Sequence, residues 1–449
     1  MLLIGLVAQS SPAYQTSGIA ASPLARADVK LLRRQLDEKS RPGARMQIAL
    51  VVDGTRGDIQ PMLVLGRALA AEGHTVRLCA PPDFREAAKV AGLEFRAVGM
   101  DVRAYLTSHA HALQGRPIHA LREAVRYARE CLRAQFEALP EATSNCQYLI
   151  GAGIQLAGPS VAALRGVPYT YVAYCPILFP SGEYPSMVLP HQTLPSWANR
   201  LSWHATRAFF NQVFRRILGE RRAELGLPPV RDVLDYLVGE RPTLAADHEL
   251  APLPSDCAIR VRRIRALQPS PGDPLPAKLD SFLQQGPPPV YVGFGSMTDS
   301  DSARTTREIA KALSAVGCRA IVSRGWAGLG GVPLPEGVLE IGAVCHVRLF
   351  PQLAAVVHHG GAGTTTAAAR AGIPQIVVPH IADQPYWGRR VELLGIGPPA
   401  IPRKRFSAQT LEAALTAILD NEIVAERASE LAGRLRARAA IDVDPILGS

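Results

Sequence analysis

Short apolar runs of strand length alternate with helical patterns, and this alternation occurs twice along the chain of 449 residues. In the first half, the runs 46–52, 75–80 and 93–99 are separated by helical patterns at 61–73 and 84–92. Strands joined through single helices and short loops are typical of a doubly wound parallel sheet. The pattern therefore predicts an α/β fold, and its repetition predicts two Rossmann-like halves that face each other across a cleft.

A proline-rich stretch separates the two halves and sets the expected domain boundaries. We expect an extension that is disordered or not native, an N-terminal Rossmann-like domain, a linker, a C-terminal Rossmann-like domain and a C-terminal tail or helix. Their expected bounds are 1–45, 46–265, 266–288, 289–430 and 431–449. Ligands of such sheets bind at the carboxyl ends of the strands.

The composition limits the function classes. The net charge is +10, and 43 of the 49 basic residues are arginines. We read the arginine excess as codon bias and the run Arg260–Arg265 as a solvated segment, so no nucleic-acid partner is expected. Seven scattered cysteines without a C-x-x-C pair fit a reducing compartment. No apolar run approaches the roughly 18 residues of a membrane span, which favours a cytoplasmic protein.

The stretch VVHHGGAGTTTAAARAG, Val356–Gly372, predicts a strand, a tight glycine turn and a helix. Glycines let backbone N–H groups approach a ligand, and a helix N-terminus favours negative charge. The pattern indicates a phosphate site in which a histidine supplies the cation and threonine hydroxyls add donors. Adjacent side chains in a strand point to opposite faces, which argues against a metal held by His358 and His359 together.

A second polar pair opens the next helix. Asp383 and Gln384 stand at the start of DQPYWGRRV, after a buried strand. Donor and acceptor side chains at such a place suit the hydroxyl groups of a sugar. The alternative is that Asp383 only caps its helix.

Together, the motifs VYVGFGSM, LFPQLAAVVHHGGAGTT and DQPYWGRRV, with GTRGDIQPMLVLGRALAAEGHTVRLCAPPDF near the N-terminus, resemble inverting family-one nucleotide-sugar glycosyltransferases. The resemblance is greatest to the sterol glucosyltransferase and bacterial antibiotic glycosyltransferase branches. It implies the two-domain GT-B fold and transfer of a sugar, such as glucose, to a hydroxyl group of a hydrophobic acceptor. It implies a nucleotide-sugar co-substrate and no metal or other cofactor.

The resemblance also implies the donor site. His359 matches the histidine that contacts the diphosphate, and Asp383 with Gln384 matches the pair that holds the sugar. The other matching positions lie near the phosphates, the base and the ribose. They are Ser296, Trp326, Val344, Gly361, Gly363, Thr364 and Thr365. Ala343 stands where many relatives have a tryptophan against the base, so UDP and dTDP both remain open as donor nucleotides.

Inverting transfer needs a base that deprotonates the acceptor hydroxyl. Many relatives use a histidine in the first N-terminal loop, where this chain has Arg56. The antibiotic branch uses an aspartate two residues later, which is Asp58 here. Asp58 is the expected base, unless it only caps a helix that begins near Pro61. Asp53 is the second candidate, and His109 or His111 could assist the acceptor.

Two further segments bear on the chemistry. The DSD triplet at Asp299–Asp301 has the form of a D-x-D metal motif, but we read it as the cap of the following helix. Residues 175–210 are rich in proline and aromatic side chains and suit the lining of a hydrophobic acceptor site. Those side chains are Trp197, Trp203, Phe209 and Phe210. Core packing explains them equally well, and docking to a lipid surface is a third reading.

Two other functions fit the same scaffold. A nucleotide-sugar epimerase would need no acceptor pocket, whereas residues 175–210 offer the composition of one. A non-catalytic helper of a glycosyltransferase would be expected to lose the glycine turn, which this chain keeps. Donor hydrolysis measured with and without hydrophobic alcohols separates these alternatives.

Overall fold

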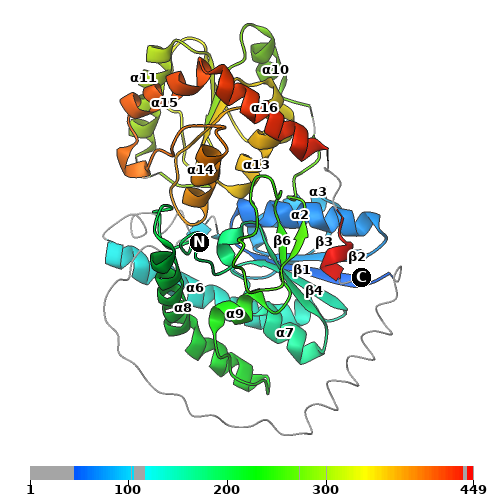
Figure 1. Cartoon of the computed structure of the whole chain (residues 1–449). Coiled ribbons are helices and arrows are strands. Elements are labelled where there is room, and N and C mark those ends of the chain that lie inside the picture. Colours follow the sequence, from blue (N-terminus) through cyan, green and yellow to red (C-terminus); the bar gives the residue numbers. More distant parts are fainter. Residues whose placement is uncertain are drawn as a thin grey trace.

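The computed structural model describes residues 45–102, 104–105, 117–272, 274–299, 301–437 and 442–447. Two parallel sheets form the two halves of the molecule, one above the other in Figure 1. All strand pairs in both sheets are parallel. The predicted α/β architecture with two doubly wound halves is therefore confirmed.

The N-terminal sheet has seven strands in the order β3-β2-β1-β4-β5-β6-β7. The strands are β1 (Gln47–Asp53), β2 (Thr75–Ala80), β3 (Glu94–Ala97), β4 (Tyr148–Gly153), β5 (Tyr169–Ala173), β6 (Thr243–Ala245) and β7 (Arg262–Ile264). The helices that accompany them are α2 (Arg56–Ala71), α3 (Arg85–Val90), α6 (Pro117–Ala142), α7 (Gly158–Arg165), α8 (Ser196–Glu224) and α9 (Val233–Val238). The first three strands overlap the predicted apolar runs 46–52, 75–80 and 93–99.

The C-terminal sheet has five strands in the order β10-β9-β8-β11-β12. The strands are β8 (Val290–Gly293), β9 (Ala320–Ser323), β10 (Val338–Ile341), β11 (Ala355–His358) and β12 (Gln375–Val377). The helices are α10 (Ala277–Gln284), α11 (Ser302–Val316), α12 (His346–Leu349), α13 (Ala362–Ala371), α14 (Gln384–Leu393), α15 (Ala408–Leu419), α16 (Glu422–Arg436) and α17 (Asp444–Leu447).

Two local predictions need correction. The helix expected to begin near Pro61 begins at Arg56, because Thr55 and Asp58 form a capping box that starts it earlier. The segment Arg260–Arg265 is solvated only in part: Arg260 and Arg263 are exposed, but Arg262–Ile264 form strand β7 at the edge of the seven-stranded sheet. The guanidinium of Arg262 donates to the carbonyl of Ile446 at 3.1 Å, so the segment is tied to α17.

The two halves pack directly against each other. The largest cluster of buried apolar side chains contains Tyr184 and Leu250 from the first half and Ala369, Tyr386 and Trp387 from the second. After α16, the short helix α17 returns to the N-terminal sheet, where Figure 1 shows it beside the first half. None of the described helices is long and apolar enough to cross a membrane.

Candidate active site

The candidate site lies where the strand order of each sheet reverses. In the first sheet, β1 and β4 are neighbours, and helices leave them toward opposite edges. In the second sheet, β8 and β11 have the same relationship. A crevice forms beyond the carboxyl ends of two such strands, and ligands bind in it. Asp53 ends β1, and His359 follows β11, so the predicted residues lie at these two positions.

Asp58 lies in the first turn of α2, directly after β1. Its Oδ2 accepts hydrogen bonds from the backbone N–H of Thr55 at 2.9 Å and from the Thr55 hydroxyl at 3.4 Å. The capping function is therefore real, and these bonds occupy a single carboxylate oxygen. The side chain is only half-buried, but the protein around it removes enough water to raise the pKa of Asp58 above its ordinary value.

Asp53 is the more enclosed of the two carboxylates, with 5% of its surface exposed. The amide of Gln135 in α6 donates to Asp53 Oδ2 at 2.6 Å and to the carbonyl of Ile154 at 2.9 Å. Burial raises the pKa of Asp53 to about 6, although the hydrogen bond from Gln135 opposes this rise. Gln135 could not be predicted from the sequence, because it is one polar residue among many in the long amphipathic helix α6.

The two histidines after β11 have different environments, as strand alternation predicts. His358 is fully buried, and its Nδ1 accepts from the N–H of Gly360 at 3.1 Å. Its Nε2 is therefore the protonated nitrogen and donates to Gln375 Oε1 at 3.0 Å. Burial lowers the pKa of His358 to about 4. Both ring nitrogens of His358 form hydrogen bonds within the protein, so His359 is the histidine of the pair that can contact a ligand.

His359 is enclosed by glycines. A Cβ atom at Gly295 would lie 2.8 Å from His359 Cε1, and one at Gly361 would lie 2.5 Å from Nε2. Burial, with His358, His380 and His346 nearby, lowers the pKa of His359 well below its ordinary value. This direction disfavours the cationic form that the sequence pattern suggests for the histidine. Its Nδ1 is buried and has no hydrogen-bond partner among the described residues.

The glycine turn leads directly into α13. Gly361 is the N-cap, and the helix begins at Ala362 with Gly363 and Thr364 in its first turn. The first N–H groups of a helix have no partner within it, so this end presents free donors. Thr365 differs from the prediction, because its hydroxyl donates to the carbonyl of Gly361 at 3.0 Å and its side chain is fully buried. Thr364 keeps its hydroxyl outside the helix hydrogen bonds.

Asp383 and Gln384 begin α14, as predicted. Asp383 is the N-cap residue, but its carboxylate accepts from Trp387 Nε1 at 2.9 Å and makes no side-chain capping bond. The Oε1 of Gln384 accepts from the N–H groups of His380 at 2.7 Å and Ile381 at 3.0 Å. That oxygen is saturated. The amide nitrogen donates one N–H to Met297 Sδ at 3.3 Å, which leaves its second N–H for a ligand.

Charged groups of the two halves influence each other. Desolvation raises the pKa of Asp383 to about 6, and the negative charge of Asp58 contributes to this rise. In the same way, burial and the positive charge of Arg56 both lower the pKa of His346 in the second half. Helices α2 and α13 are also in contact. The first turn of α2 therefore faces the donor-side half, and sequence reasoning had noted Arg56 only as the residue that replaces a histidine.

The remaining predicted donor positions lie in loops after strands of the second sheet. Ser296 follows β8, Trp326 follows β9, and Val344 lies between β10 and α12. The N–H of Trp326 donates to the carbonyl of Gly295 at 2.9 Å, which joins two of these loops. All three side chains are half-buried. The same edge of the sheet thus brings together every predicted donor residue.

The DSD triplet is structural. Asp301 is the N-cap of α11, and its carboxylate accepts from the N–H of Arg304 at 2.9 Å, as predicted. Asp299 binds Arg403 at 2.6 Å and the hydroxyl of Thr305 at 2.7 Å. Within the described part of the chain, no cluster of three metal-ligating side chains is found.

The aromatic side chains of residues 175–210 have mixed roles. Trp203 and Phe210 are buried in the core of the first half, so core packing explains them. Phe209 packs against the same core, and Trp197 is 70% exposed. The segment nevertheless reaches the second half, because the rings of Tyr184 and Tyr386 meet edge to face at 5.6 Å. His109 and His111 lie outside the described residues.

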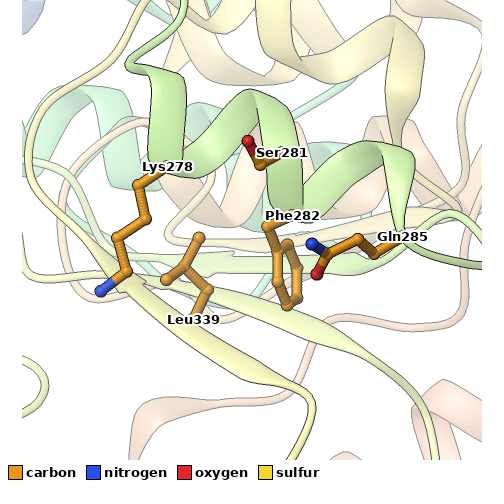
Figure 2. A pocket seen from close by; sticks show the side chains of 5 residues that line it. All are labelled: Lys278, Ser281, Phe282, Gln285 and Leu339. Atoms are coloured by element: carbon orange, nitrogen blue, oxygen red, sulfur yellow. The ribbon is translucent and has the colours of Figure 1, made fainter.

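A surface hollow on the second half is unrelated to these residues. Four residues of α10, which are Lys278, Ser281, Phe282 and Gln285, line it together with Leu339 of β10 (Figure 2). The hollow shares no residue with the glycine turn, and Lys278 is its only ionisable side chain. We assign it no chemistry.

Two parallel α/β halves with a phosphate-type turn at one switch point and a carboxylate at the other define a nucleotide-dependent transferase of the GT-B class. The N-terminal domain of glycosyltransferase family 28 matches residues 48–165. The C-terminal domain of the erythromycin biosynthesis protein CIII-like family matches residues 311–441.

Relatives that cover most of the chain agree with these matches. The vancomycin aglycone glucosyltransferase of Amycolatopsis orientalis is 37% identical over 405 residues, which cover 87% of this chain and 94% of the relative. A sterol 3-beta-glucosyltransferase of Arabidopsis thaliana is 32% identical, with 91% and 69% covered. The structure of the glycosyltransferase VinC in complex with dTDP shares the fold with a TM-score of 0.63 at 20% identity, over 88% of this chain and 96% of VinC. The chain therefore belongs to the glycosyltransferase family that includes the vancomycin aglycone glucosyltransferase.

Proposed function

We propose that this glycosyltransferase moves a hexosyl group, glucose in the simplest case, from a UDP- or dTDP-sugar to a hydroxyl group of a bulky hydrophobic acceptor, with inversion. The main support is that α2, which carries Asp58, contacts α13, whose N-terminal N–H groups are free, and that the charge of Asp58 contributes to the raised pKa of Asp383 in the other half. Vancomycin aglycone and a sterol are the acceptors in the names of two relatives, which supports a bulky acceptor.

In this proposal the donor half binds the leaving group. The N-terminal turn of α13 and the hydroxyl of Thr364 bind the diphosphate oxygens. A ligand oxygen also explains the unpaired Nδ1 of His359, since buried polar atoms are rarely left without a partner. A neutral imidazole donates one N–H, and a bound diphosphate raises the pKa of the ring through its negative charge. Asp383 and the amide nitrogen of Gln384 bind the sugar hydroxyls.

The acceptor half supplies the base. The acceptor oxygen attacks the anomeric carbon, its proton passes to Asp58, and the bond from that carbon to the diphosphate oxygen breaks. A carboxylate is a better base when desolvation raises its pKa, which is the direction found for Asp58. Gly54 is needed beside it, because a Cβ atom there would lie 2.2 Å from Asp58 Oδ2.

The direct test is to incubate the protein with UDP-glucose and dTDP-glucose and a panel of hydrophobic alcohols and phenols. We expect a hexosyl mass gain on an acceptor and an inverted anomeric configuration by NMR. An epimerised nucleotide sugar, formed equally well without acceptor, would instead support the epimerase alternative. No turnover of either donor would support the non-catalytic helper.

Transfer should depend on pH through Asp58. Its raised pKa means that the base is protonated, and inactive, at a higher pH than an ordinary aspartate would be. We expect the rate with an aliphatic alcohol to fall as pH is lowered through this pKa, and to level off above it. A pH profile of kcat/KM measures this fall in rate at low pH. The same fall at the same pH in the Asp58→Asn variant would show that another group titrates there.

Transfer should also survive excess EDTA. The phosphate charge is met by helix N–H groups and side-chain donors, and Asp299 is already bound to Arg403 and Thr305. We therefore expect initial rates within about twofold of the untreated enzyme, since no metal has to stabilise the leaving group. Loss of activity with EDTA and its return with Mn²⁺ would contradict this and make Asp299 and Asp301 the first candidates for ligands.

A further inference from the structure

One turn of the first half receives hydrogen bonds from both helices that carry the donor site. This turn, Asp247–Ala251, follows β6 at the carboxyl edge of the seven-stranded sheet. The carbonyl of Asp247 accepts from the N–H groups of Leu250 at 3.1 Å and Ala251 at 2.8 Å, which closes the turn. The side chain of Asp247 is fully buried. A buried carboxylate requires paired partners, and here they come from both halves.

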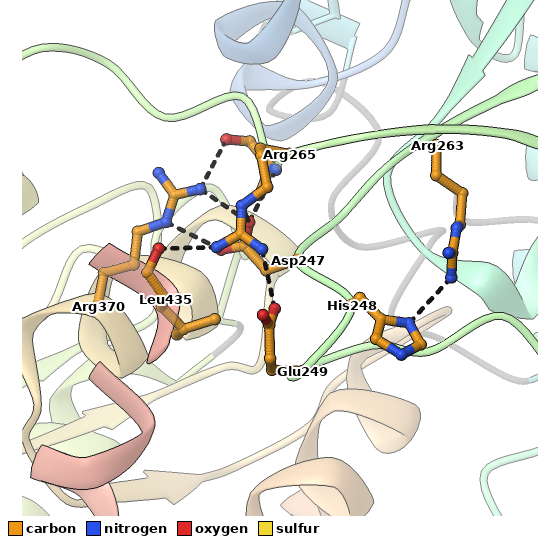
Figure 3. Close-up of polar contacts among 8 residues, drawn as sticks. Asp247, His248, Glu249, Arg263, Arg265, Arg370 and Leu435 are labelled. Atoms are coloured by element: carbon orange, nitrogen blue, oxygen red, sulfur yellow. Dashed lines mark hydrogen bonds and ion pairs between the residues drawn. The ribbon is translucent and has the colours of Figure 1, made fainter. Parts of the chain in front are cut away.

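The first contact comes from α13. Arg370 lies in its last turn, and its Nε donates to Asp247 Oδ2 and a terminal nitrogen to Oδ1, both at 2.9 Å. The terminal nitrogen also donates to the carbonyl of Ala266 at 3.1 Å. Figure 3 shows this fork around Asp247. A bidentate arginine–carboxylate pair fixes orientation as well as distance. The opposite end of α13 is the glycine turn.

The second contact comes from α14. Arg390 lies in its last turn, and its Nε donates to the carbonyl of Leu250 at 2.8 Å. The opposite end of α14 carries Asp383 and Gln384. Each helix has ten residues, so about 15 Å of rigid rod separates the contacted end from the ligand-facing end. A shift at the turn would therefore move both ligand-facing ends together.

The turn itself is held mainly by Arg265 of the first half, which also contacts α16 of the second half. Arg265, next to β7, forms ion pairs with Asp247 at 3.0 Å and with Glu249 at 2.8 Å. Its guanidinium also donates to the carbonyl of Leu435 in α16 at 2.7 Å. The N–H of Ala266 donates to Asp247 Oδ1 at 3.1 Å. These contacts, drawn in Figure 3, hold the turn rigidly in place where Arg370 and Arg390 contact it.

We propose that Asp247, Arg370 and Arg390 form an interdomain clamp that sets the donor-site helices against Asp58. They are positioning residues, which act through α13 and α14 and touch no substrate. This inference rests on the proposed function, because it assigns the clamp to the distance between the donor and the base. Since the nucleotide contacts lie within the second half, loosening the clamp lowers turnover and leaves nucleotide binding intact.

Arg390→Gln and Arg389→Gln make a matched pair of variants. Arg389 is adjacent on α14 but pairs with Glu392 of the same helix at 2.8 Å, so its loss spares the clamp. Arg370→Lys is the third variant, which keeps the charge and removes the fork. Misplacing reacting groups by about 1 Å costs on the order of a hundredfold in rate, and a partial loosening costs less. We expect Arg390→Gln and Arg370→Lys to lower kcat on the order of tenfold.

The dissociation constants of UDP and dTDP, measured by calorimetry, should stay within about twofold of the wild-type values, and Arg389→Gln should match wild type in both measurements. A residue with a merely structural role would lower the melting temperature without separating kcat from nucleotide affinity. Equal kcat values for the Arg389 and Arg390 variants, or a parallel loss of nucleotide binding, would overturn the clamp.

Hydrogen–deuterium exchange provides a readout that does not depend on activity. Loosening one contact of a shared turn should expose amides on both helices. Arg390→Gln should therefore speed exchange in Asp247–Ala251 and in α13 as well as in α14. Faster exchange confined to α14 would show that the contacts are independent and would overturn the clamp. If wild type transfers no sugar but exchange spreads to α13, the proposed function fails and the mechanical coupling stands.

Discussion

Replacing Asp58 with Asn lowers the rate of transfer to an aliphatic alcohol by roughly two to four orders of magnitude, the usual contribution of a general base. Asparagine keeps the size of the side chain and a carbonyl oxygen that can accept the capping bonds from Thr55. It removes only the basicity. The measurement is kcat/KM for an aliphatic alcohol, together with the dissociation constant of UDP or dTDP. That constant should change little, because we propose that these nucleotides bind the opposite half.

An acidic phenol provides an internal comparison, because it loses its proton with less help and should suffer a smaller decrease. Asp53→Asn is the matched variant, five positions earlier on the same strand–helix connection. Asp53 already accepts from Gln135, so its replacement should reduce transfer much less than that of Asp58. Near-normal transfer by the Asp58 variant, with severe loss in the Asp53 variant, would move the base to Asp53.

Replacing His359 with Ala lowers kcat by on the order of a hundredfold, as the loss of one preorganised donor to a developing anion does. The physical reason is that its buried Nδ1 has no hydrogen-bond partner among the described residues and can form a hydrogen bond with an oxygen of the bound ligand. The fold should be unaffected, because the ring makes no hydrogen bond that the rest of the chain needs. Initial rates at saturating donor and a thermal melting curve measure the two effects.

His358→Ala is the contrasting variant. Both of its ring nitrogens are bonded within the protein, and its loss leaves the buried amide of Gln375 without that partner. Leaving a buried polar group unsatisfied costs about 1–3 kcal/mol of unfolding free energy. His358→Ala should therefore destabilise the protein, whereas His359→Ala should remain stable and lose activity. Unchanged kinetics in a folded His359 variant would exclude its contact with the diphosphate.

The sequence predicts much of the fold because long apolar runs identify buried strands. Strands β1, β2 and β3 overlap predicted apolar runs, whereas β6 and β7 have three residues each and are too short to show a periodicity. The start of α2 was misplaced because Pro61 is a familiar helix-start signal, whereas a capping box five residues earlier is a stronger one. Such short-range competition between signals limits the accuracy of element boundaries.

The site residues likewise divide into those that the sequence indicates and those that it does not. Residues carried on a motif, such as His359 and Asp383, can be proposed from the sequence, because glycine turns and helix starts have local signatures and the family resemblance selects His359 from the histidine pair. Contacts between distant segments have none. Gln135 reaches Asp53 across 82 positions, and Arg370 reaches Asp247 across 123. The lowered pKa of His359 could not be predicted either, since it depends on burial and on three other histidines.

The most direct test of the proposed site is a crystal structure of the protein with UDP or dTDP bound. We expect diphosphate oxygens within hydrogen-bond distance of the N–H groups in the first turn of α13 and of the His359 ring. The end of the diphosphate that would carry the sugar should point toward Asp383 and the carboxylate of Asp58. A nucleotide bound with its diphosphate away from the α13 N-terminus, or within the first half, would contradict the proposal.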